Sequence, residues 1–306
     1  MTDLPRVTVI CTCYNHAQYV VQALDSVLMQ TYQNVQLIIV DNASTDKSAD
    51  VIKKFIAQHS SVIFIENKIN LGICKAFNIA VGYSDGKYLI DLSADDVLLP
   101  NRIEHQITEF EKLDDSYGMM YSNIEYINKS GKLTGNSCHK KNYPSGNIFQ
   151  NILAEYIIPS PSTIFKKSVF LKIGGYNDLL AFEDFDFWVR CAFYFNIQFT
   201  AEITTQKRIL KDSFSTAFYS TNSDKMLRST LATYAWAKEK LRNSEENQAY
   251  QKGMNYYFGQ CILLGHFSLA KVYLTLMEQP SGLKNKILLI LLRKKINLSF
   301  FQNFTK

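Results

Sequence analysis

The segment Lys87-Tyr88-Leu89-Ile90-Asp91-Leu92-Ser93-Ala94-Asp95-Asp96 begins as an apolar strand and ends in two adjacent carboxylates that have no cation beside them. Two neighbouring anions repel each other, so they persist at low cost only where water or a divalent metal ion neutralises them. By itself, such a pair is also typical of a solvated turn. The neighbouring sequence favours a metal ion, because the first hundred residues alternate strands with helices and place polar clusters at the strand ends. Open α/β sheets bind their ligands at these ends.

Strands and helices alternate on both sides of this segment. The β-branched run at 7–13 is typical of a buried parallel strand, and apolar residues between 17 and 30 repeat with a helical period. Further strands are expected at 35–40, 62–65 and 88–92, and further helices around 51–56, at 73–81 and at 101–113. Strands joined by helices pair in parallel through right-handed crossovers. The sequence therefore predicts an α/β fold with a Rossmann-like, mostly parallel sheet flanked by helices.

The regular alternation stops after Gly118. We then expect a strand at 119–127, a turn at 128–131, a polar irregular loop at 135–146, a helix at 147–156, a short strand at 162–165, a break at Gly174-Gly175 and an aromatic-rich helix at 185–195. From Ser223 onward helical patterns dominate, which indicates an α-helical appendage. We therefore predict an α/β domain at 1–220 and a helical C-terminal region at 221–306 that ends in a basic amphipathic tail.

The charge of the chain is concentrated in this tail. The 306 residues carry a formal net charge of +5 at pH 7, and no acidic residue follows Leu283. The tail alternates apolar residues with cations, namely Lys284, Lys286, Arg293, Lys294, Lys295 and Lys306. A nucleic-acid-binding protein more often spreads its cations over a folded face with aromatic platforms. We therefore expect no nucleic-acid partner, and an interfacial helix on an anionic membrane surface, with a core-packing helix as the alternative.

The cysteines and the N-terminus point to the cytoplasm. The six cysteines form no C-x-x-C pair, and Cys11 and Cys13 lie two apart in a strand, where they face the same side and do not bond to each other. Reduced core thiols suit the cytosol. The first residues lack the pattern of a secretory signal, and no stretch approaches the roughly 20 apolar residues of a membrane span. We expect a cytoplasmic protein, peripheral on the inner membrane through its tail.

Three polar clusters follow three of the expected strands, and parallel strands bring such clusters to one edge of a sheet. They contain Tyr14, Asp41 and the pair Asp95-Asp96. A nucleotide would use all three, because an aromatic ring stacks on a base, a carboxylate accepts from a base N–H, and an acidic pair holds a cation on a diphosphate. Tyr14 as a core aromatic and Asp41 as a helix cap are the alternatives.

Two further segments carry candidate chemistry. Asn70-Leu71-Gly72 precedes a helix that bears Lys75, so a turn, a helix N-terminus and a cation are available for a phosphate, although a solvated lysine is the common alternative. In Phe182-Glu183-Asp184-Phe185-Asp186-Phe187-Trp188, carboxylates lie among aromatic rings. Loss of solvation raises a carboxyl pKa and favours a role as proton acceptor. The alternative is a helix N-terminus that uses the acids to complement its dipole.

The order of these motifs resembles the family 2 glycosyltransferases of the GT-A fold. The resemblance covers about residues 5 to 215 and rests on the segments at 7–15, 41–46, 70–72, 92–96, 159–166, 174–176 and 183–184. It implies an inverting, hexosyl-type transfer from a nucleotide-diphosphate sugar, expected to be a UDP-sugar, with Mn²⁺ or Mg²⁺ on the diphosphate. The implied acceptor is a glycan or a lipid-linked glycan in cell-surface polysaccharide synthesis.

The resemblance also implies roles for single residues. By matching positions, Thr12, Tyr14, Asp41 and Asn70 would contact the nucleoside, and Asn15, Gly72, Lys75, Ser93 and Ala94 would complete the donor site. Asp95 would ligate the metal with Asp96 beside it, Asp184 would be the catalytic base, and Glu183 would orient the site or the acceptor. Two positions depart from the family pattern, because Ser93 replaces a common aspartate and Leu210 stands where many members carry a histidine.

Two other functions share features of this sequence, namely that of a nucleotidyltransferase and that of a sugar-nucleotide-binding protein. A nucleotidyltransferase shares the nucleotide crevice and the acidic metal site, but it would carry a Gly-rich loop with Arg and Lys after the first strand, and residues 13–16 have neither. A sugar-nucleotide-binding protein with impaired catalysis is suggested by Ser93 and by the basic tail. The presence of Asp184 argues for an enzyme.

Overall fold

The computed structural model describes residues 4–138, 142–210, 221–278 and 283–296. It divides the chain into two compact units. The first comprises residues 1–147, 158–178 and 194–210, and the second comprises 148–157, 179–193 and 211–306. The second unit therefore takes in two segments that precede residue 221. The last ten residues of the basic tail, 297–306, lie outside the described residues.

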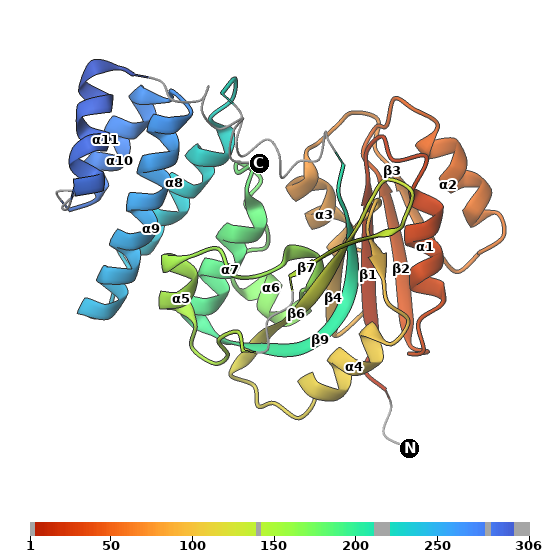
Figure 1. The fold of residues 1–306 in the computed structure, drawn as a ribbon. Coiled ribbons are helices and arrows are strands. Elements are labelled where there is room, and N and C mark those ends of the chain that lie inside the picture. Colours follow the sequence, from red (N-terminus) through yellow and green to blue (C-terminus); the bar gives the residue numbers. More distant parts are fainter. Residues whose placement is uncertain (1–3, 139–141, 211–220, 279–282, 297–306) are drawn as a thin grey trace. The chain divides into compact units, whose positions relative to one another are not determined.

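The first unit is built on one nine-stranded sheet (Figure 1). Its strands are β1 (Val7–Cys13), β2 (Val35–Asp41), β3 (Ile63–Glu66), β4 (Tyr88–Ser93), β5 (Val97–Leu98), β6 (Tyr117–Ile127), β7 (Leu133–Cys138), β8 (Ile164–Lys166) and β9 (Asn196–Arg208). They lie in the order β3-β2-β1-β4-β8-β6-β9-β5, and β7 pairs with β6. The first four strands of this order are parallel, as the sequence predicts. Beyond β4 the sheet is mixed, because β8 is antiparallel to both β4 and β6.

Helices cover both faces of the parallel strands. They are α1 (Val20–Leu28), α2 (Ser48–Ile56), α3 (Ile73–Val81) and α4 (Arg102–Phe110), with the 3-10 turn Ser160–Ser162 and α6 (Lys167–Lys172) near β8. Figure 1 shows α1 and α2 on one side of β1 and β2 and α3 on the other. These helices form because their apolar residues fall on one face, as in α4, where Ile103, Ile107 and Phe110 are buried and the intervening positions are mostly polar.

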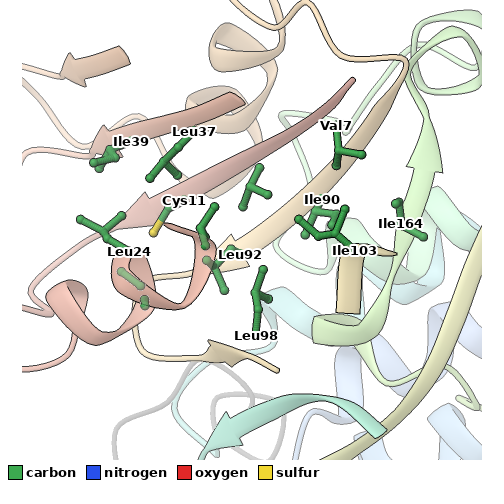
Figure 2. Close-up of a cluster of buried hydrophobic side chains, with 14 of the residues drawn as sticks. Val7, Cys11, Leu24, Leu37, Ile39, Ile90, Leu92, Leu98, Ile103 and Ile164 are labelled. Atoms are coloured by element: carbon green, nitrogen blue, oxygen red, sulfur yellow. The ribbon is translucent and has the colours of Figure 1, made fainter. Parts of the chain in front are cut away.

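The main core lies between the sheet and three of the helices, α1, α2 and α4 (Figure 2). Alternate residues of β1, β2 and β4 point into it, which for β1 are Val7, Val9, Cys11 and Cys13. Cys11 and Cys13 therefore share a face, as expected. Among the residues whose side chains are described, all five cysteines are free and buried. Burial raises the pKa of the Cys13 thiol to about 11, so this thiol is an unreactive part of the core.

Besides the two-residue strand β5, which was not expected, two longer strands differ from the sequence-based expectation. The expected irregular loop at 135–146 is wrong in its first part, because β7 extends to Cys138 as the hairpin partner of β6. This strand follows a turn in which Gly131 has φ +83° and the Asn128 N–H donates to the Lys132 carbonyl (2.8 Å). β9 was not expected at all. The two strands carry little regular hydrophobic alternation, since β7 is largely exposed and the pairing of β9 with β6 shifts register at three points.

The second unit is helical, and this confirms the predicted α-helical C-terminal region. It contains α5 (Phe149–Ala154), most of α7 (Glu183–Tyr194), α8 (Lys225–Lys238), α9 (Ser244–Leu263), α10 (Phe267–Leu276) and α11 (Leu283–Lys294). The long helix α9 packs against α5, α8, α10 and α11. Its start is fixed by the Asn243 side chain, which accepts from the Glu246 N–H (2.8 Å) as an N-cap.

Candidate active site

The sheet brings the expected strand-end residues to one edge. In the parallel register, Cys13 lies opposite Asp41, and Thr12 lies opposite Ser93. The chain then turns away from the sheet at each of these points, and the Ala94 N–H donates to the Thr12 carbonyl (3.1 Å). Thr12, Asp41, Ser93 and Ala94 are therefore neighbours at the carboxyl edge of β1, β2 and β4.

The loop after β1 is tied to the loop after β2 by hydrogen bonds. Asn15 has φ +59°, and its side-chain oxygen accepts from the N–H groups of Thr45 (2.7 Å) and Asp46 (3.3 Å). In the opposite direction, the Asn15 N–H donates to Ser44 Oγ (2.9 Å). Oδ1 of Asn15 therefore holds the loop in place, while the neighbouring Tyr14 is 44% exposed. An exposed ring on a fixed loop is available for stacking on a base.

Asp41 is buried at the end of β2, with an exposed fraction of 1%. Its Oδ2 accepts from the Ser44 N–H (3.0 Å) in the loop after β2, and it does not cap α2, which begins at Ser48 and has no side-chain cap. Its buried Oδ1 has no hydrogen-bond partner among the described residues. An unpaired buried carboxylate oxygen costs free energy, so this atom is a natural acceptor for a ligand N–H or O–H.

The side-chain amide of Asn42, the residue after Asp41, connects the end of β2 to the loop before α3. The Asn42 amide donates to Asn70 Oδ1 (3.1 Å), and the same oxygen accepts from the Gly72 N–H (2.9 Å). Gly72 has φ +79°, a conformation that glycine adopts without strain, and it stands immediately before α3. Lys75 lies one turn into α3 and is exposed. The structure thus connects Asn70 and Gly72 to the strand-end group, with Lys75 on the adjoining helix.

The adjacent acids Asp95 and Asp96 have different environments. Asp96 is 4% exposed, and its Oδ1 accepts from the backbone N–H of Arg208 (2.9 Å) in β9. Burial and the neighbouring Asp95 raise the pKa of the Asp96 carboxyl, and the Arg208 N–H opposes this shift. Asp95 accepts at Oδ1 from the Ser93 hydroxyl, and the same oxygen lies 3.8 Å from Nδ1 of His16. The Asp96 carboxylate therefore binds the backbone of β9, whereas the Asp95 carboxylate faces His16 in the loop after β1.

Arg208 supports this pair and was not expected from the sequence. Its Nε–H donates to the Asp95 carbonyl (2.9 Å), and its Nη2 donates to Gln22 Oε1 (2.7 Å) in α1. The guanidinium also lies over the ring of Tyr19, 4.7 Å from the centroid. A cavity of about 620 Å³ adjoins it, lined by Gln18, Tyr19, Gln22, Asn128, Lys129, Ser130 and Arg208. The sequence could not reveal Arg208 because its role depends on β9.

The side chains of Asp95 and its neighbours fit a divalent cation for which the protein supplies only some of the ligands. Within the described ranges, no three His, Cys, Asp or Glu side chains are grouped as metal ligands. Mg²⁺ and similar cations are commonly held by one or two carboxylates together with substrate phosphates and water. Asp95 is such a carboxylate, and the unpaired Nδ1 of His16 lies beside it. Asp95 is thus the residue that would hold the cation, while one oxygen of Asp96 already accepts from the backbone.

The second expected acidic group lies in the second unit, in the first turn of α7. Asp184 Oδ2 accepts from the Tyr156 hydroxyl (3.3 Å), and its Oδ1 accepts from the Phe185 N–H (2.6 Å). The Tyr156 ring stacks on Phe182 (5.5 Å between centroids) and contacts Trp188 (5.1 Å). Asp184 therefore lies at a helix N-terminus, which was the alternative, and near aromatic rings; its role as a proton acceptor stays a prediction.

The neighbouring acids of α7 differ from Asp184 in burial and pairing. Glu183 is 8% exposed and Asp186 is 4% exposed, whereas Asp184 is partly exposed. Asp186 forms an ion pair with Arg190 (2.6 Å) and accepts from the Thr233 hydroxyl (3.2 Å). Asp186 thus joins α7 to α8, which leaves Asp184 as the most accessible carboxylate of this turn.

The sequence of the chain is similar to the sequences of known proteins. The sequence pattern of the family described as "Glycosyl transferase family 2" matches residues 8–174. An uncharacterized glycosyltransferase of Methanocaldococcus jannaschii is 31% identical over 191 residues, which cover 62% of this chain and 65% of that protein. The present chain thus spans just under two thirds of the length of that relative.

Solved structures show the same fold at low sequence identity. Residues 1–349 of TarS from S. aureus, in complex with UDP-GlcNAc, superpose with a TM-score of 0.71 at 16% identity, covering 95% of this chain and 88% of that chain. The mannosyltransferase PcManGT from Pyrobaculum calidifontis, in complex with GDP-Man and Mn²⁺, gives a TM-score of 0.61 at 17% identity, covering 94% and 79%. The predicted GT-A fold is thereby confirmed. Because the family pattern matches more than half of its residues, the chain is a member of glycosyl transferase family 2.

Proposed function

We propose that the chain is an inverting, hexosyl-type glycosyltransferase that uses a UDP-sugar and acts on a glycan or a lipid-linked acceptor in cell-surface polysaccharide synthesis. The observation that carries the proposal is the polar edge at the carboxyl ends of β1, β2 and β4, which lies inside the family-matched residues. At this edge a buried oxygen of Asp41 lacks a partner within the described chain. The UDP-GlcNAc bound by TarS supports the choice of nucleotide.

The donor would lie along this edge. The Tyr14 ring would stack on the base, Asp41 Oδ1 would accept from a base N–H, and Thr12 and Asn70 would complete the nucleoside contacts. The remaining proposed donor contacts are Asn15, Gly72, Lys75, Ser93 and Ala94. Since Oδ1 of Asn15 already accepts from the Thr45 N–H, the contact of Asn15 with the donor would come from its side-chain nitrogen or its backbone.

Asp95 would hold a Mn²⁺ or Mg²⁺ ion. Asp96, beside it, would fix the turn after β4 by accepting from the Arg208 N–H of β9. The cation, when bound, would supply positive charge beside the departing nucleotide diphosphate. Mn²⁺ accompanies GDP-Man in the PcManGT structure, which supports a divalent cation here as well. Ser93 would orient Asp95 through its hydroxyl, and this gives the serine a role at the position where the family commonly has an aspartate.

Removal of the acceptor proton is assigned to Asp184. Its carboxylate is fixed by Tyr156 and by the Phe185 N–H, and it is partly accessible, as a base that receives a proton from a substrate must be. Direct attack by the acceptor hydroxyl, with no enzyme nucleophile, inverts the anomeric centre. Glu183, which is buried beside it, would orient the site.

We also propose attachment to the cytoplasmic face of the inner membrane through α11. One face of α11 packs inside its unit, since Leu288 and Leu292 are each 6% exposed, whereas Ile287 (50%) and Ile290 (51%) are half exposed. Lys286, Arg293 and Lys294 are exposed along the same helix. No helix in the described part of the chain is long and apolar enough to cross a membrane. In this proposal, residues 1–220 form the glycosyltransferase domain and 221–306 form the attachment region.

A donor panel tests the proposed function. Binding of UDP-, GDP- and dTDP-sugars would be measured by calorimetry with and without Mn²⁺, followed by an assay for donor hydrolysis and transfer. We expect a UDP-sugar to bind in a metal-dependent manner and to be turned over. Binding without turnover would indicate a sugar-nucleotide-binding protein, and binding of no sugar nucleotide would contradict the proposal.

A further inference from the structure

His16 has a buried ring nitrogen that the fold leaves without a partner. Nδ1 is inaccessible to solvent and has no hydrogen-bond partner among the described residues, although the side chain as a whole is 25% exposed. Its nearest charged neighbour is Oδ1 of Asp95, at 3.8 Å. This distance is too long for a hydrogen bond. A buried polar atom without a hydrogen-bond partner costs free energy, so burial of this nitrogen lowers the stability of the folded chain.

The position of His16 is fixed by hydrogen bonds of its backbone. Its N–H donates to Ser48 Oγ (2.9 Å), and its carbonyl accepts from the N–H groups of Tyr19 (2.9 Å) and Val20 (3.0 Å). The following residue, Ala17, donates from its N–H to Asp46 Oδ2 (3.1 Å). These hydrogen bonds hold the loop against the start of α2 and against α1. They therefore fix the backbone that places the imidazole near Asp95.

We propose that His16 is a second protein ligand of the divalent cation, binding through Nδ1 beside Asp95 Oδ1. The 3.8 Å separation is less than the roughly 4.2 Å that two ligands on opposite sides of one cation can span. The Asp95 oxygen has two lone pairs, of which the Ser93 hydroxyl uses one. This inference rests on the proposed function, because it concerns the cation that would accompany the nucleotide diphosphate.

The alternative is an ion pair between a protonated His16 and Asp95. The two arrangements predict opposite effects when the imidazole is removed. A ligand strengthens cation binding, whereas a protonated imidazole competes with the cation for Asp95 and weakens it. The two arrangements also differ in metal preference, because an imidazole ligand favours first-row transition metals over Mg²⁺, and affinity rises from Mn²⁺ to Co²⁺.

The test compares His16→Ala and His16→Gln with the wild-type chain. Calorimetry would measure the Kd of Mn²⁺, Co²⁺ and Mg²⁺ in the presence of UDP, and the visible absorption of bound Co²⁺ would report its ligands. We expect both variants to bind Mn²⁺ and Co²⁺ about ten- to a hundredfold more weakly, the range that results from changing even an outer partner of a metal ligand. Mg²⁺ binding should change less, and the Co²⁺ spectrum should shift.

His59→Ala is the matched control, because it removes another imidazole of the same unit, one that packs on Phe55 beyond the C-terminal end of α2. It should leave all three Kd values and the Co²⁺ spectrum unchanged. Thermal unfolding would confirm that each variant is folded, and His16→Gln retains a side chain of similar length in case His16→Ala does not fold.

Failure of this inference is distinct from failure of the proposed function. If the wild-type chain binds no cation in the presence of UDP, the proposed metal-dependent donor site is wrong. If the wild type binds the cation and both His16 variants bind it equally well or more tightly, with the same Co²⁺ spectrum, His16 is not a ligand. The proposed function would then stand with Asp95 alone.

Discussion

At the scale of single residues, two adjacent acids with the same side chain have different roles. Asp96 accepts from the Arg208 N–H and is buried, whereas Asp95 faces Ser93 and His16. The family resemblance assigned the metal to Asp95 and placed Asp96 beside it, but the sequence did not show the contacts that distinguish the two acids. Their difference depends on a backbone group of β9, which lies more than a hundred residues away in the chain. The importance of Arg208 was hidden for the same reason.

Asp184 is the residue whose proposed role is tested most simply by substitution. Asp184→Asn removes the proton acceptor and keeps the shape of the side chain, so we expect kcat to fall by about a hundredfold or more while the Kd of the donor stays near that of the wild type. Steady-state kinetics and donor titration would measure both values.

The control for this substitution is Glu245→Gln, which makes the same change of charge at an exposed acid in the first turn of α9, in the same unit. It should leave kcat unchanged. Wild-type turnover by Asp184→Asn would assign the base elsewhere, and Glu183 would be the first candidate to test next.

At the scale of elements, the regular spacing of apolar residues was sufficient to predict most helices and strands of the α/β core. The helix expected at 73–81 matches α3, and the expected strands of the parallel set lie within one or two residues of the observed bounds. Elements without a regular apolar pattern were missed, namely β7, most of which is exposed, and the irregular β9. Such strands form because they pair with β6, and pairing between distant segments leaves no periodic signal in one sequence.

Helix α4 contains an interaction that stabilises the centre of the first unit. Arg102 is fully buried, and its guanidinium donates to the carbonyls of Pro161 (2.6 Å) and Thr163 (2.9 Å) and to Thr205 Oγ1 (2.7 Å). Burial lowers the pKa of Arg102 to about 9. Arg102→Met would leave these acceptors without their donor, so we expect the free energy of unfolding to fall by about 2–4 kcal/mol.

Urea unfolding would measure this change, with Arg6→Met as the comparison. Arg6 pairs with Asp85 (2.7 Å) at the surface, where both side chains are about half exposed, and its loss should cost no more than about 1 kcal/mol. Equal losses for the two variants would show that the buried hydrogen bonds of Arg102 contribute little.

Helix α11 carries a prediction about the membrane. Ile287→Asp together with Ile290→Asp places two anions on the exposed apolar face, and we expect it to reduce co-sedimentation with anionic vesicles several-fold, more so at low salt. Val272→Asp, an exposed apolar position on α10 (44%), is the control and should bind as the wild type does. Equal pelleting of all three proteins, with anionic and with neutral vesicles, would remove α11 as an attachment surface.

At the scale of the whole molecule, the chain combines an α/β unit that carries the strand-end site with a helical unit that carries Asp184 and α11. The fold class and the family followed from the order of motifs along the sequence, in which the segments at 7–15, 41–46 and 92–96 mark the ends of parallel strands. The sequence could not predict the tertiary contacts of the motif residues. Examples are Asn15, which fixes a loop, and Arg208, which supports the acidic pair. Side-chain roles of this kind depend on tertiary contacts.

We propose above that Asp95, after the end of β4, holds the cation that allows a nucleotide diphosphate to bind. The most direct measurement is calorimetric titration of UDP into the wild type, Asp95→Ala and Asp96→Ala, each with and without Mn²⁺. We predict that Mn²⁺ strengthens UDP binding to the wild type and that Asp95→Ala abolishes this dependence. Asp96→Ala should mainly lose stability, because the Arg208 N–H loses its acceptor. Unchanged Mn²⁺ dependence of UDP binding in a folded Asp95→Ala variant would show that Asp95 does not hold the cation.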